Sequence, residues 1–130
     1  MTRHLDADVL ARLAETEEIV LETRRKHGEI RQTPLWVVVV DGEAYIRSWH
    51  GPRGRWYHDL LRMPGAVLHV GGQTVPVRAC RVEEPETLEQ VSQAYLAKYN
   101  RTPYQKRYAP EMVLPETLPT TIRLEQAHPA

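Results

Sequence analysis

Residues 35–48, LWVVVVDGEAYIRS, contain the clearest turn in the sequence, because Asp41 and Gly42 separate two strand-like runs. An Asp-Gly pair in this setting is the strongest short-range signal for a two-residue hairpin. With such a loop, alternation divides the side chains between two faces of the hairpin. One face carries Trp36, Val38, Tyr45 and Arg47. The other face, expected to point to the core, carries Leu35, Val37, Val39, Ala44, Ile46 and Ser48.

The segments before this hairpin predict a helix and two strands. Residues 1–16 are expected to contain an N-terminal helix with Asp6 as its cap. EIVLETRR alternates, so that Ile19, Leu21 and Thr23 share a face, and Gly28 in the next turn is free to adopt a positive φ. IRQTPLWVVVV, residues 30–40, predicts one long strand whose apolar end is covered on both faces.

The segments after the hairpin predict two helices, a second hairpin and a last strand. RWYHDLLRM has helical spacing and ends at Pro64-Gly65, and AVLHV pairs with TVPVRACRV across the turn GGQ. Residues 85–100 form an amphipathic helix with Leu88, Val91, Tyr95 and Tyr99 on its buried side. Residues 101–118 are rich in proline and lack a period, which predicts an extended arm before a final strand at 119–125.

These elements predict a single domain of 130 residues with an α+β, mainly β architecture. About six short antiparallel strands and three helices favour a small β-barrel, with its core in residues 17–84 and helices in the N-terminal, central and C-terminal parts.

Composition argues against several functional classes. The formal net charge is zero, whereas a general nucleic-acid or membrane-surface binder requires a dominant basic field. The longest apolar run, LWVVVV, has the length of a strand, so no membrane span is expected. The start of the chain lacks the apolar core of a signal peptide, and Cys80 is the only cysteine, which together favour a cytoplasmic protein.

The common catalytic motifs are absent from the sequence. It contains no H-E-x-x-H, Walker-type loop, G-x-G-x-x-G or G-x-S-x-G pattern. The six histidines are scattered without metal-ligand spacing, so we expect no metal site. Hydrolase, kinase and zinc-enzyme functions are therefore disfavoured, and no catalytic acid, base or nucleophile is assigned.

The turn WHGPRGRW, residues 49–56, is the best candidate for a ligand site. Gly51 and Gly54 allow close backbone approach, Arg53 and Arg55 supply charge, and a predicted helix begins directly afterwards. Free N–H groups at a helix N-terminus and arginine side chains both bind anions such as phosphate. The alternative is that the arginines are simply solvated and Trp56 is a core residue.

A second group of basic residues strengthens the ligand interpretation. Arg24, Arg25 and Lys26 precede a turn, and Arg31 follows it. If a barrel closes, this pair of strands lies beside the hairpin, and Thr33 and Trp36 add a hydroxyl and an aromatic wall. A flat ligand that bears a phosphate requires such a mixture.

The order of these motifs resembles the flavin- and deazaflavin-binding split β-barrel superfamily. That group includes pyridoxamine-phosphate-oxidase-like proteins and deazaflavin-dependent nitroreductases, and the likeness is greatest to a small bacterial family of unknown function within it. The resemblance covers residues 18–124. It is carried by Arg25, Lys26, Gly28, Arg31, Thr33, Pro34, Leu35, Arg47, Ser48, Gly51, Gly54, Trp56, Tyr57, Asp59, Leu60 and Pro64.

The resemblance implies a homodimer with FMN or a deazaflavin in each of two clefts at its interface. Arg31 and Thr33 are then phosphate-side contacts, Arg47, Ser48 and Trp49 lie along the cleft, and Trp36, Arg53 and Trp56 complete the cofactor-binding set. The implied activity is an oxidoreductase, similar to a nitroreductase, that acts on a small electron-poor substrate.

Two other hypotheses remain at this point. The first is a non-catalytic binding or dimerisation protein whose ligand site is degenerate or accepts a different flat anion. It is favoured by Trp49, which stands where small residues are common in the resembling proteins. The second, single-stranded nucleic-acid binding, is disfavoured by the neutral charge.

Overall fold

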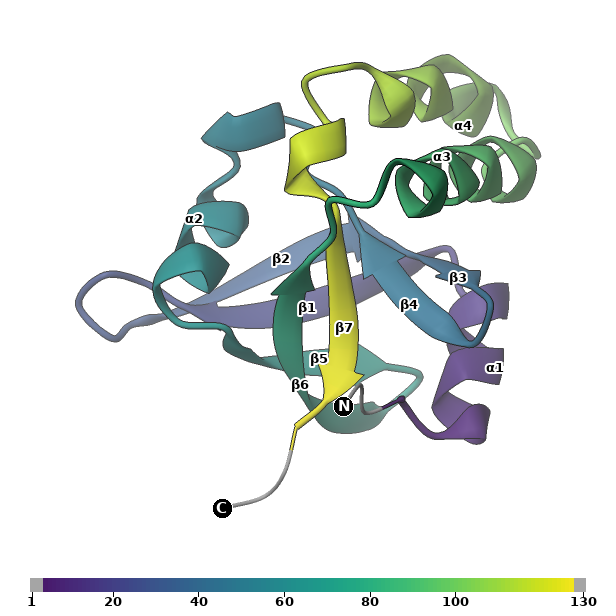
Figure 1. Ribbon diagram of the computed structural model, residues 1–130. Helices are drawn as coiled ribbons and strands as arrows, with labels where there is room; N and C mark the ends of the chain where they lie inside the picture. Colours follow the sequence, from purple (N-terminus) through teal and green to yellow (C-terminus); the bar gives the residue numbers. More distant parts are fainter. Residues whose placement is uncertain (1–3, 128–130) are drawn as a thin grey trace.

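The computed structural model describes residues 4–127, which form one curled antiparallel sheet with helices packed around it (Figure 1). The sheet contains seven strands in the order β2-β1-β5-β6-β7-β4-β3. The strands are β1 Glu18–Arg24, β2 Ile30–Trp36, β3 Val38–Val40, β4 Glu43–Ile46, β5 Gly65–Val70, β6 Gln73–Arg81 and β7 Ile122–Gln126. The α+β, mainly β barrel predicted from the sequence is therefore confirmed, with seven strands in place of about six.

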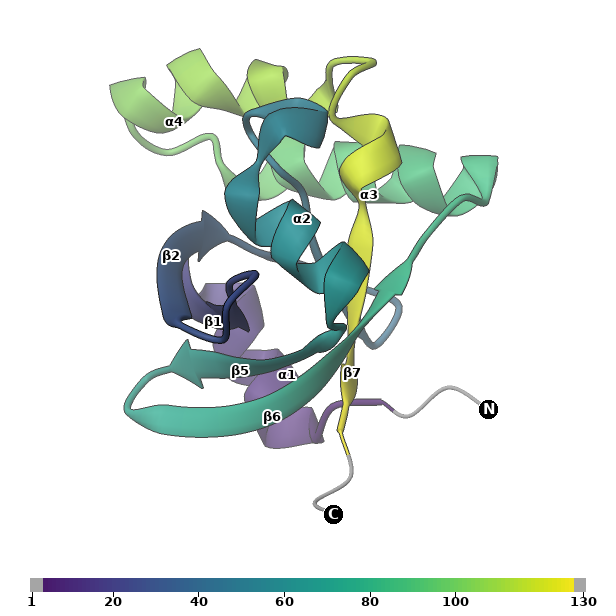
Figure 2. The same ribbon diagram turned by 90° about the vertical axis from the view of Figure 1, so that its left-hand side faces the viewer.

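The helices cover the ends and one side of the curled sheet. They are α1 Ala7–Glu15, α2 Arg55–Arg62, α3 Pro85–Lys98 and α4 Pro103–Tyr108, with short 3₁₀ helices at Gly51–Arg53, Ala109–Val113 and Leu118–Thr120. Figure 2 shows α3 and α4 together over one end of the sheet and α2 on the side of the strands below them. The helices near the N-terminus, after the hairpin and in the C-terminal part thus lie as expected.

The strand predicted over residues 30–40 is divided at Val37, and this break shapes the barrel. β2 and β3 follow each other in the chain but lie at opposite edges of the sheet. The Val37 N–H donates to the Tyr99 hydroxyl at 3.0 Å, and the Lys98 Nζ donates to the Val37 carbonyl at 2.6 Å. Side chains from the end of α3 therefore replace ladder hydrogen bonds at the bend, which satisfies the buried backbone there.

The Asp41-Gly42 hairpin forms in the predicted register. Val38 pairs with Tyr45 and Val40 pairs with Glu43. Asp41 and Gly42 have φ values of 49° and 75°, as a two-residue hairpin turn with two positive φ angles requires.

Both faces of this hairpin are buried, which explains its apolar sequence. Val37, Ala44 and Ile46 lie in the main core inside the sheet. On the opposite face, Val38 and Tyr45 pack under α3 in a second core that contains Val91, Tyr95, Tyr99 and Met112. The buried stripe predicted for the helix at residues 85–100 is thus present.

The segment expected to be an extended arm, residues 101–118, is helical instead. α4 begins after Thr102, whose Oγ1 accepts a hydrogen bond from the Gln105 N–H at 3.1 Å. Pro103, Pro110 and Pro119 each lie at the first or second position of a helical turn. A proline does not destabilise a helix at these positions, because the N–H that it lacks would have no acceptor within the helix. These three prolines therefore lie at the starts of short helices, whereas Pro115 lies in a turn.

Candidate functional site

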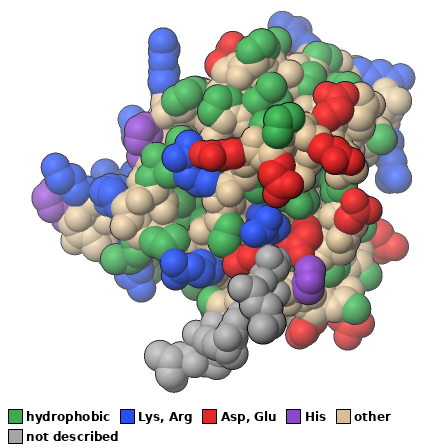
Figure 3. Space-filling view, viewed as in Figure 1, with side chains coloured by type: hydrophobic (Ala, Val, Ile, Leu, Met, Phe, Trp, Pro, Cys, Tyr) green, Lys and Arg blue, Asp and Glu red, His purple; other side chains and the backbone are tan. Residues whose placement is uncertain are grey.

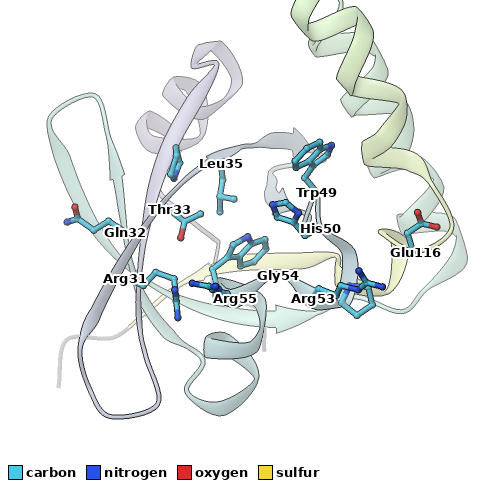
Figure 4. Close-up of a pocket in the computed structure, with 13 residues that line it drawn as sticks. Arg31, Gln32, Thr33, Leu35, Trp49, His50, Arg53, Gly54, Arg55 and Glu116 are labelled. Atoms are coloured by element: carbon cyan, nitrogen blue, oxygen red, sulfur yellow. The ribbon is translucent and has the colours of Figure 1, made fainter.

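A pocket of about 1070 Å³ opens between β2 and the start of α2. Figure 4 shows Arg31, Thr33 and Leu35 projecting from β2 into the same space, while Gln32 points away. Trp49, Arg53, Arg55 and Trp56 line the opposite side. This space is called the first pocket below. It brings Arg31 of one basic group together with Arg53 and Arg55 of the other, because β2 and the turn before α2 meet there.

Arg31 is oriented towards the first pocket by a buried carboxylate. Asp59, which is 1% exposed, accepts a hydrogen bond from Arg31 Nε at 2.8 Å and another from Thr23 Oγ1 at 2.7 Å. Arg62 Nη2 donates to its other oxygen at 2.7 Å. Because only Nε of Arg31 is used in this network, the two terminal nitrogens remain available to a ligand.

The network also holds Asp59 in its charged form. Burial, the largest single effect, raises the pKa of Asp59, and the hydrogen bonds from Arg31 and Thr23 lower it. The positive charges of Arg31 and Arg62 act in the same direction, so the pKa of Asp59 lies below its ordinary value. The side chain is therefore ionised near neutral pH, where it pairs with Arg31.

The start of α2 adds backbone donors to the same pocket. α2 follows Gly54, which caps the helix without a side-chain hydrogen bond, so the first N–H groups of the helix have no acceptor within it. A Cβ at position 54 would lie 2.1 Å from Ser48 Oγ, and Gly51 has a φ of 62°. Glycine is therefore required where the chain folds tightly over residue 48.

Ser48 lies beneath this turn. It is 1% exposed, its N–H donates to Thr120 Oγ1 at 3.0 Å, and its carbonyl accepts from Gly51 at 2.9 Å. Its Oγ is buried and has no hydrogen-bond partner in the described part of the chain. Ser48 therefore supports the turn from below, whereas Trp49 and Arg53 reach the pocket.

Arg47 and Trp36 lie away from the first pocket. Arg47 is 1% exposed and donates to Thr121 Oγ1, Ser92 Oγ and the carbonyls of Met112 and Leu88, at distances of 2.8 to 3.0 Å. Burial lowers its pKa from the ordinary arginine value. Trp36 stacks on Tyr99 with ring centroids 4.1 Å apart. Both residues line a smaller, second pocket of about 310 Å³ beside α4.

Trp49 separates the two pockets. It is 47% exposed, lines both of them, and makes an edge-to-face contact with Tyr108 at 5.8 Å. Of the predicted cofactor-binding residues, the first pocket brings together Arg31, Thr33, Trp49, Arg53 and Trp56. Trp36 and Arg47 line the second pocket, and Ser48 lies under the turn.

Asp59, Tyr104 and Tyr108 are among the residues of these sites that were absent from the predicted binding set. Asp59 had a signal in the sequence, since an acidic residue three positions after Trp56 falls on the apolar side of a predicted helix. The tyrosines had none, because their segment was expected to be extended.

Basic side chains also gather at the tip of the β1–β2 hairpin, on the left of Figure 3, where the turn contains Arg25, Lys26 and His27. These side chains are exposed and belong to neither pocket. Within residues 4–127, no group of histidine, cysteine and acidic side chains is arranged to hold a metal ion. No helix in this range is long and apolar enough to cross a membrane.

The curled sheet, the divided strand and the surrounding helices define a split β-barrel protein. The chain belongs to the bacterial family DUF2255, described as "Uncharacterized protein conserved in bacteria", whose model matches residues 9–124. No curated protein sequence matches it.

Solved structures share this fold at low sequence identity. Conserved hypothetical protein Rv2991 from Mycobacterium tuberculosis is 18% identical with a TM-score of 0.68, and the match covers 99% of this chain and 83% of that one. The haem storage protein HutZ from Vibrio cholerae is 14% identical with a TM-score of 0.65, covering 97% and 92%. An F420-H2-dependent reductase, FDR-A, is 18% identical with a TM-score of 0.61, covering 84% and 94%.

Proposed function

We propose that this protein binds FMN or a deazaflavin in the first pocket and acts as an oxidoreductase on a small electron-poor substrate. The observation that carries the proposal is the convergence of Arg31 and the start of α2 on one pocket with aromatic walls. The similar fold of an F420-H2-dependent reductase is consistent with this class of cofactor.

The polar end of the pocket fits the phosphate of such a cofactor. Arg31 offers two terminal guanidinium nitrogens in a geometry set by Asp59, and Thr33 offers a hydroxyl two residues along β2. Arg55 and the free N–H groups at the start of α2 add positive charge from the opposite side. All of these groups are hydrogen-bond donors, and an ionised phosphate offers only hydrogen-bond acceptors, so the two are complementary.

The apolar end of the pocket fits a flat ring. Leu35 lies beyond Thr33 on the same side of β2, and Trp49 and Trp56 also line the pocket. A bound flavin or deazaflavin supplies hydride transfer, so the protein has to position the ring and exclude water. Arg31 and Thr33 would hold the phosphate end, while Leu35 and Trp49 would set the plane of the ring.

A homodimer is part of this proposal. The first pocket is open on one side, and Trp49 at its edge is 47% exposed. A second copy of the chain placed over this side would cover both the ring of the cofactor and the side chain of Trp49. Sedimentation velocity tests this point, because a monomer at micromolar concentration in the presence of cofactor would contradict it.

A second candidate function is non-catalytic binding of haem or another flat anion. His50 lines the first pocket beside Trp49, with ring centroids 4.8 Å apart, and an imidazole is an established axial ligand of haem iron. A sharp Soret band after addition of haemin, which is lost in His50→Ala while FMN has no effect, would favour this function over the first.

The decisive experiment compares two arginines that share the same carboxylate. Arg31→Ala and Arg62→Ala each remove one partner of Asp59, but only Arg31 lines the first pocket. We expect Arg31→Ala to weaken FMN binding by about 10- to 100-fold, the effect of losing a charge-assisted hydrogen bond. The Arg62→Ala variant should bind FMN nearly as tightly as the wild-type protein.

Riboflavin provides the matched ligand, since it lacks the phosphate. The original chain should prefer FMN to riboflavin, and Arg31→Ala should lose this preference. Fluorescence titration of both flavins, repeated with a deazaflavin, measures the affinities. Equal loss of binding in the two arginine variants, or no binding of any of these cofactors, would show that the proposed cofactor site is wrong.

A further inference from the structure

The second pocket adjoins the first without sharing its polar end. It lies between β2 and α4, has a volume of about 310 Å³, and has Pro34, Leu35 and Trp49 in common with the first pocket. Arg31, Thr33 and the start of α2 line only the first pocket. A ligand in the second pocket would therefore lie next to the apolar end of the first, across Trp49 and Leu35.

Four aromatic side chains from three separate parts of the chain frame the second pocket. Trp36 and Tyr104 meet edge to face with ring centroids 6.2 Å apart, and Tyr104 and Tyr108 are 4.7 Å apart. Trp49 completes the wall against Tyr108. Tyr104 is 63% exposed and Trp49 is 47% exposed, and both are large side chains gathered at a concave surface. Such a concentration is typical of a binding site for an apolar ring.

The tyrosines of this wall are held in place by polar contacts of α4. Thr102 caps the helix, and Gln105 is 5% exposed. The Gln105 amide donates to Glu17 at 2.7 Å and accepts from the backbone of Arg101 at 2.9 Å. α4, which carries Tyr104 and Tyr108, is thereby fixed to the barrel next to β1.

A buried positive charge lies at the base of the second pocket; within residues 4–127 no carboxylate accepts a hydrogen bond from it, although the charge of Glu89 on α3 acts on it. Arg47 lines this pocket, and its hydrogen-bond acceptors are two hydroxyl and two carbonyl oxygens. They occupy four of the five guanidinium N–H groups, which leaves one on Nη2. The carboxylate of Glu18 lies at the exposed rim, where solvent screens it, whereas Arg47 acts in a low dielectric.

We propose that the second pocket is a substrate subsite for a small aromatic compound that carries an anionic oxygen substituent, and that Arg47 determines this specificity. The identification of the ligand as a substrate rests on the proposed cofactor in the first pocket. The rings of Trp36, Tyr104 and Tyr108 contact the flat part of the compound, and its oxygen faces Arg47. A compound with a cationic substituent should bind more weakly, because the guanidinium of Arg47 stays protonated and repels it.

The three tryptophans of the chain make a direct test possible. Each tryptophan gives one indole N–H signal in a proton–nitrogen correlation spectrum of the labelled protein, and single Trp→Phe variants assign them. Trp36 lines only the second pocket, Trp56 lines only the first, and Trp49 lines both. Signals of Trp36 and Trp56 therefore report the two pockets separately, with or without a cofactor.

The probes are 2-naphthoate, 2-naphthol and 2-naphthylmethylammonium, which share a ring system and differ in charge. We expect 2-naphthoate to move the Trp36 and Trp49 signals but not that of Trp56, and to bind about tenfold or more tightly than the ammonium compound. Tyr104→Ala should weaken naphthoate binding, while Leu61→Ala, which removes an exposed side chain on α2, should leave it unchanged.

Three results would overturn the subsite. They are an unmoved Trp36 signal with all three probes, equal affinities for the three charges, or tighter binding of the ammonium compound. Failure of the cofactor site has a different signature, because FMN would then leave the Trp56 signal unmoved whatever the naphthalene probes do. The combination of a moved Trp36 signal and an unmoved Trp56 signal would retain the aromatic subsite and reject the cofactor.

Discussion

Arg31 on β2 and Arg47 directly after β4 have opposite surroundings. Arg31 pairs with the buried carboxylate of Asp59 and keeps its terminal nitrogens towards an open pocket. Arg47 is enclosed by α3 and the 3₁₀ helix at 109–113, and its hydrogen-bond acceptors within residues 4–127 are all neutral oxygens. The difference shows that an arginine acquires its role from what covers it. Arg31 can give hydrogen bonds to a ligand, whereas most of those of Arg47 hold the fold together.

The largest expected effect is the loss of stability on substitution of Arg47. Arg47→Ala removes a charged donor from two hydroxyl and two carbonyl oxygens, although the Met112 carbonyl retains the hydrogen bond from Thr117 Oγ1. We expect a loss of about 3 to 5 kcal/mol in the free energy of unfolding, as for removal of one partner of a buried charged network. Urea unfolding followed by circular dichroism measures it. Arg31→Ala should cost far less, and equal costs would remove the distinction between the two arginines.

Asp59 tests the pocket side of the comparison. Asp59→Asn retains the shape of the side chain but removes the charge that orients Arg31, so we expect about tenfold weaker FMN binding. Unfolding stability at pH 7 should fall by about 1 to 3 kcal/mol, because the folded state stabilises the ionised carboxylate. Unchanged FMN affinity together with lower stability would assign Asp59 to the fold alone.

The same carboxylate predicts a pH dependence. The pKa of Asp59 in the folded state is below its unfolded value of about 4. Its contribution to stability is therefore complete above the unfolded pKa and is lost as pH falls through the folded pKa. The stability difference between the original chain and Asp59→Asn should shrink when urea unfolding is repeated at successively lower pH. A difference that stays constant down to pH 2 would contradict this assignment.

Tyr99 tests the bend that separates β2 from β3. Its hydroxyl accepts the Val37 N–H and donates to the Glu17 carbonyl at 2.6 Å, while its ring stacks on Trp36. Tyr99→Phe retains the stacking and leaves a buried N–H unpaired, so we expect a loss of about 1 to 3 kcal/mol in unfolding free energy. Tyr104→Phe is the matched control, because Tyr104 is 63% exposed and should be neutral.

Ser48 should give the smallest effect. Its buried Oγ has no hydrogen-bond partner among residues 4–127, so Ser48→Ala removes a group whose burial is not compensated. We expect stability to change by less than about 0.5 kcal/mol or to rise slightly. Gly54→Ala alone should be destabilising because of its contact with Ser48 Oγ, and less so when combined with Ser48→Ala. Additive effects of the two substitutions would contradict direct contact.

Much of the fold could be predicted because its signals are local. Asp41-Gly42 determines the turn and, through alternation, the register of the hairpin. The spacing of Val91, Tyr95 and Tyr99 predicts the buried side of α3. The helical segment at 103–113 was missed because proline has two opposite meanings. A proline in the interior of a helix interrupts it, whereas a proline in the first turn favours helix formation. The N-cap at Thr102 places Pro103 in the first turn of α4.

The candidate site was predictable only in part. Arg31, Thr33, Trp49 and Trp56 carry the residue types that a phosphate and a flat ring require, and the structure brings them to one pocket. The partners that orient them come from elsewhere in the chain. Asp59 is 28 residues from Arg31, and Tyr104 is 68 residues from Trp36, so no local pattern relates them.

By itself, the sequence determined which residues alternate, where the tight turns occur and which residue types are available for binding. These properties depend on backbone sterics and on the period of a helix or strand, both of which act within a few residues. Only the tertiary structure decided that Val37 divides a strand, that Arg47 is enclosed while Arg31 faces a pocket, and that α4 provides an aromatic wall. Those outcomes depend on packing between distant segments, where burial and unpaired polar groups set the free energy.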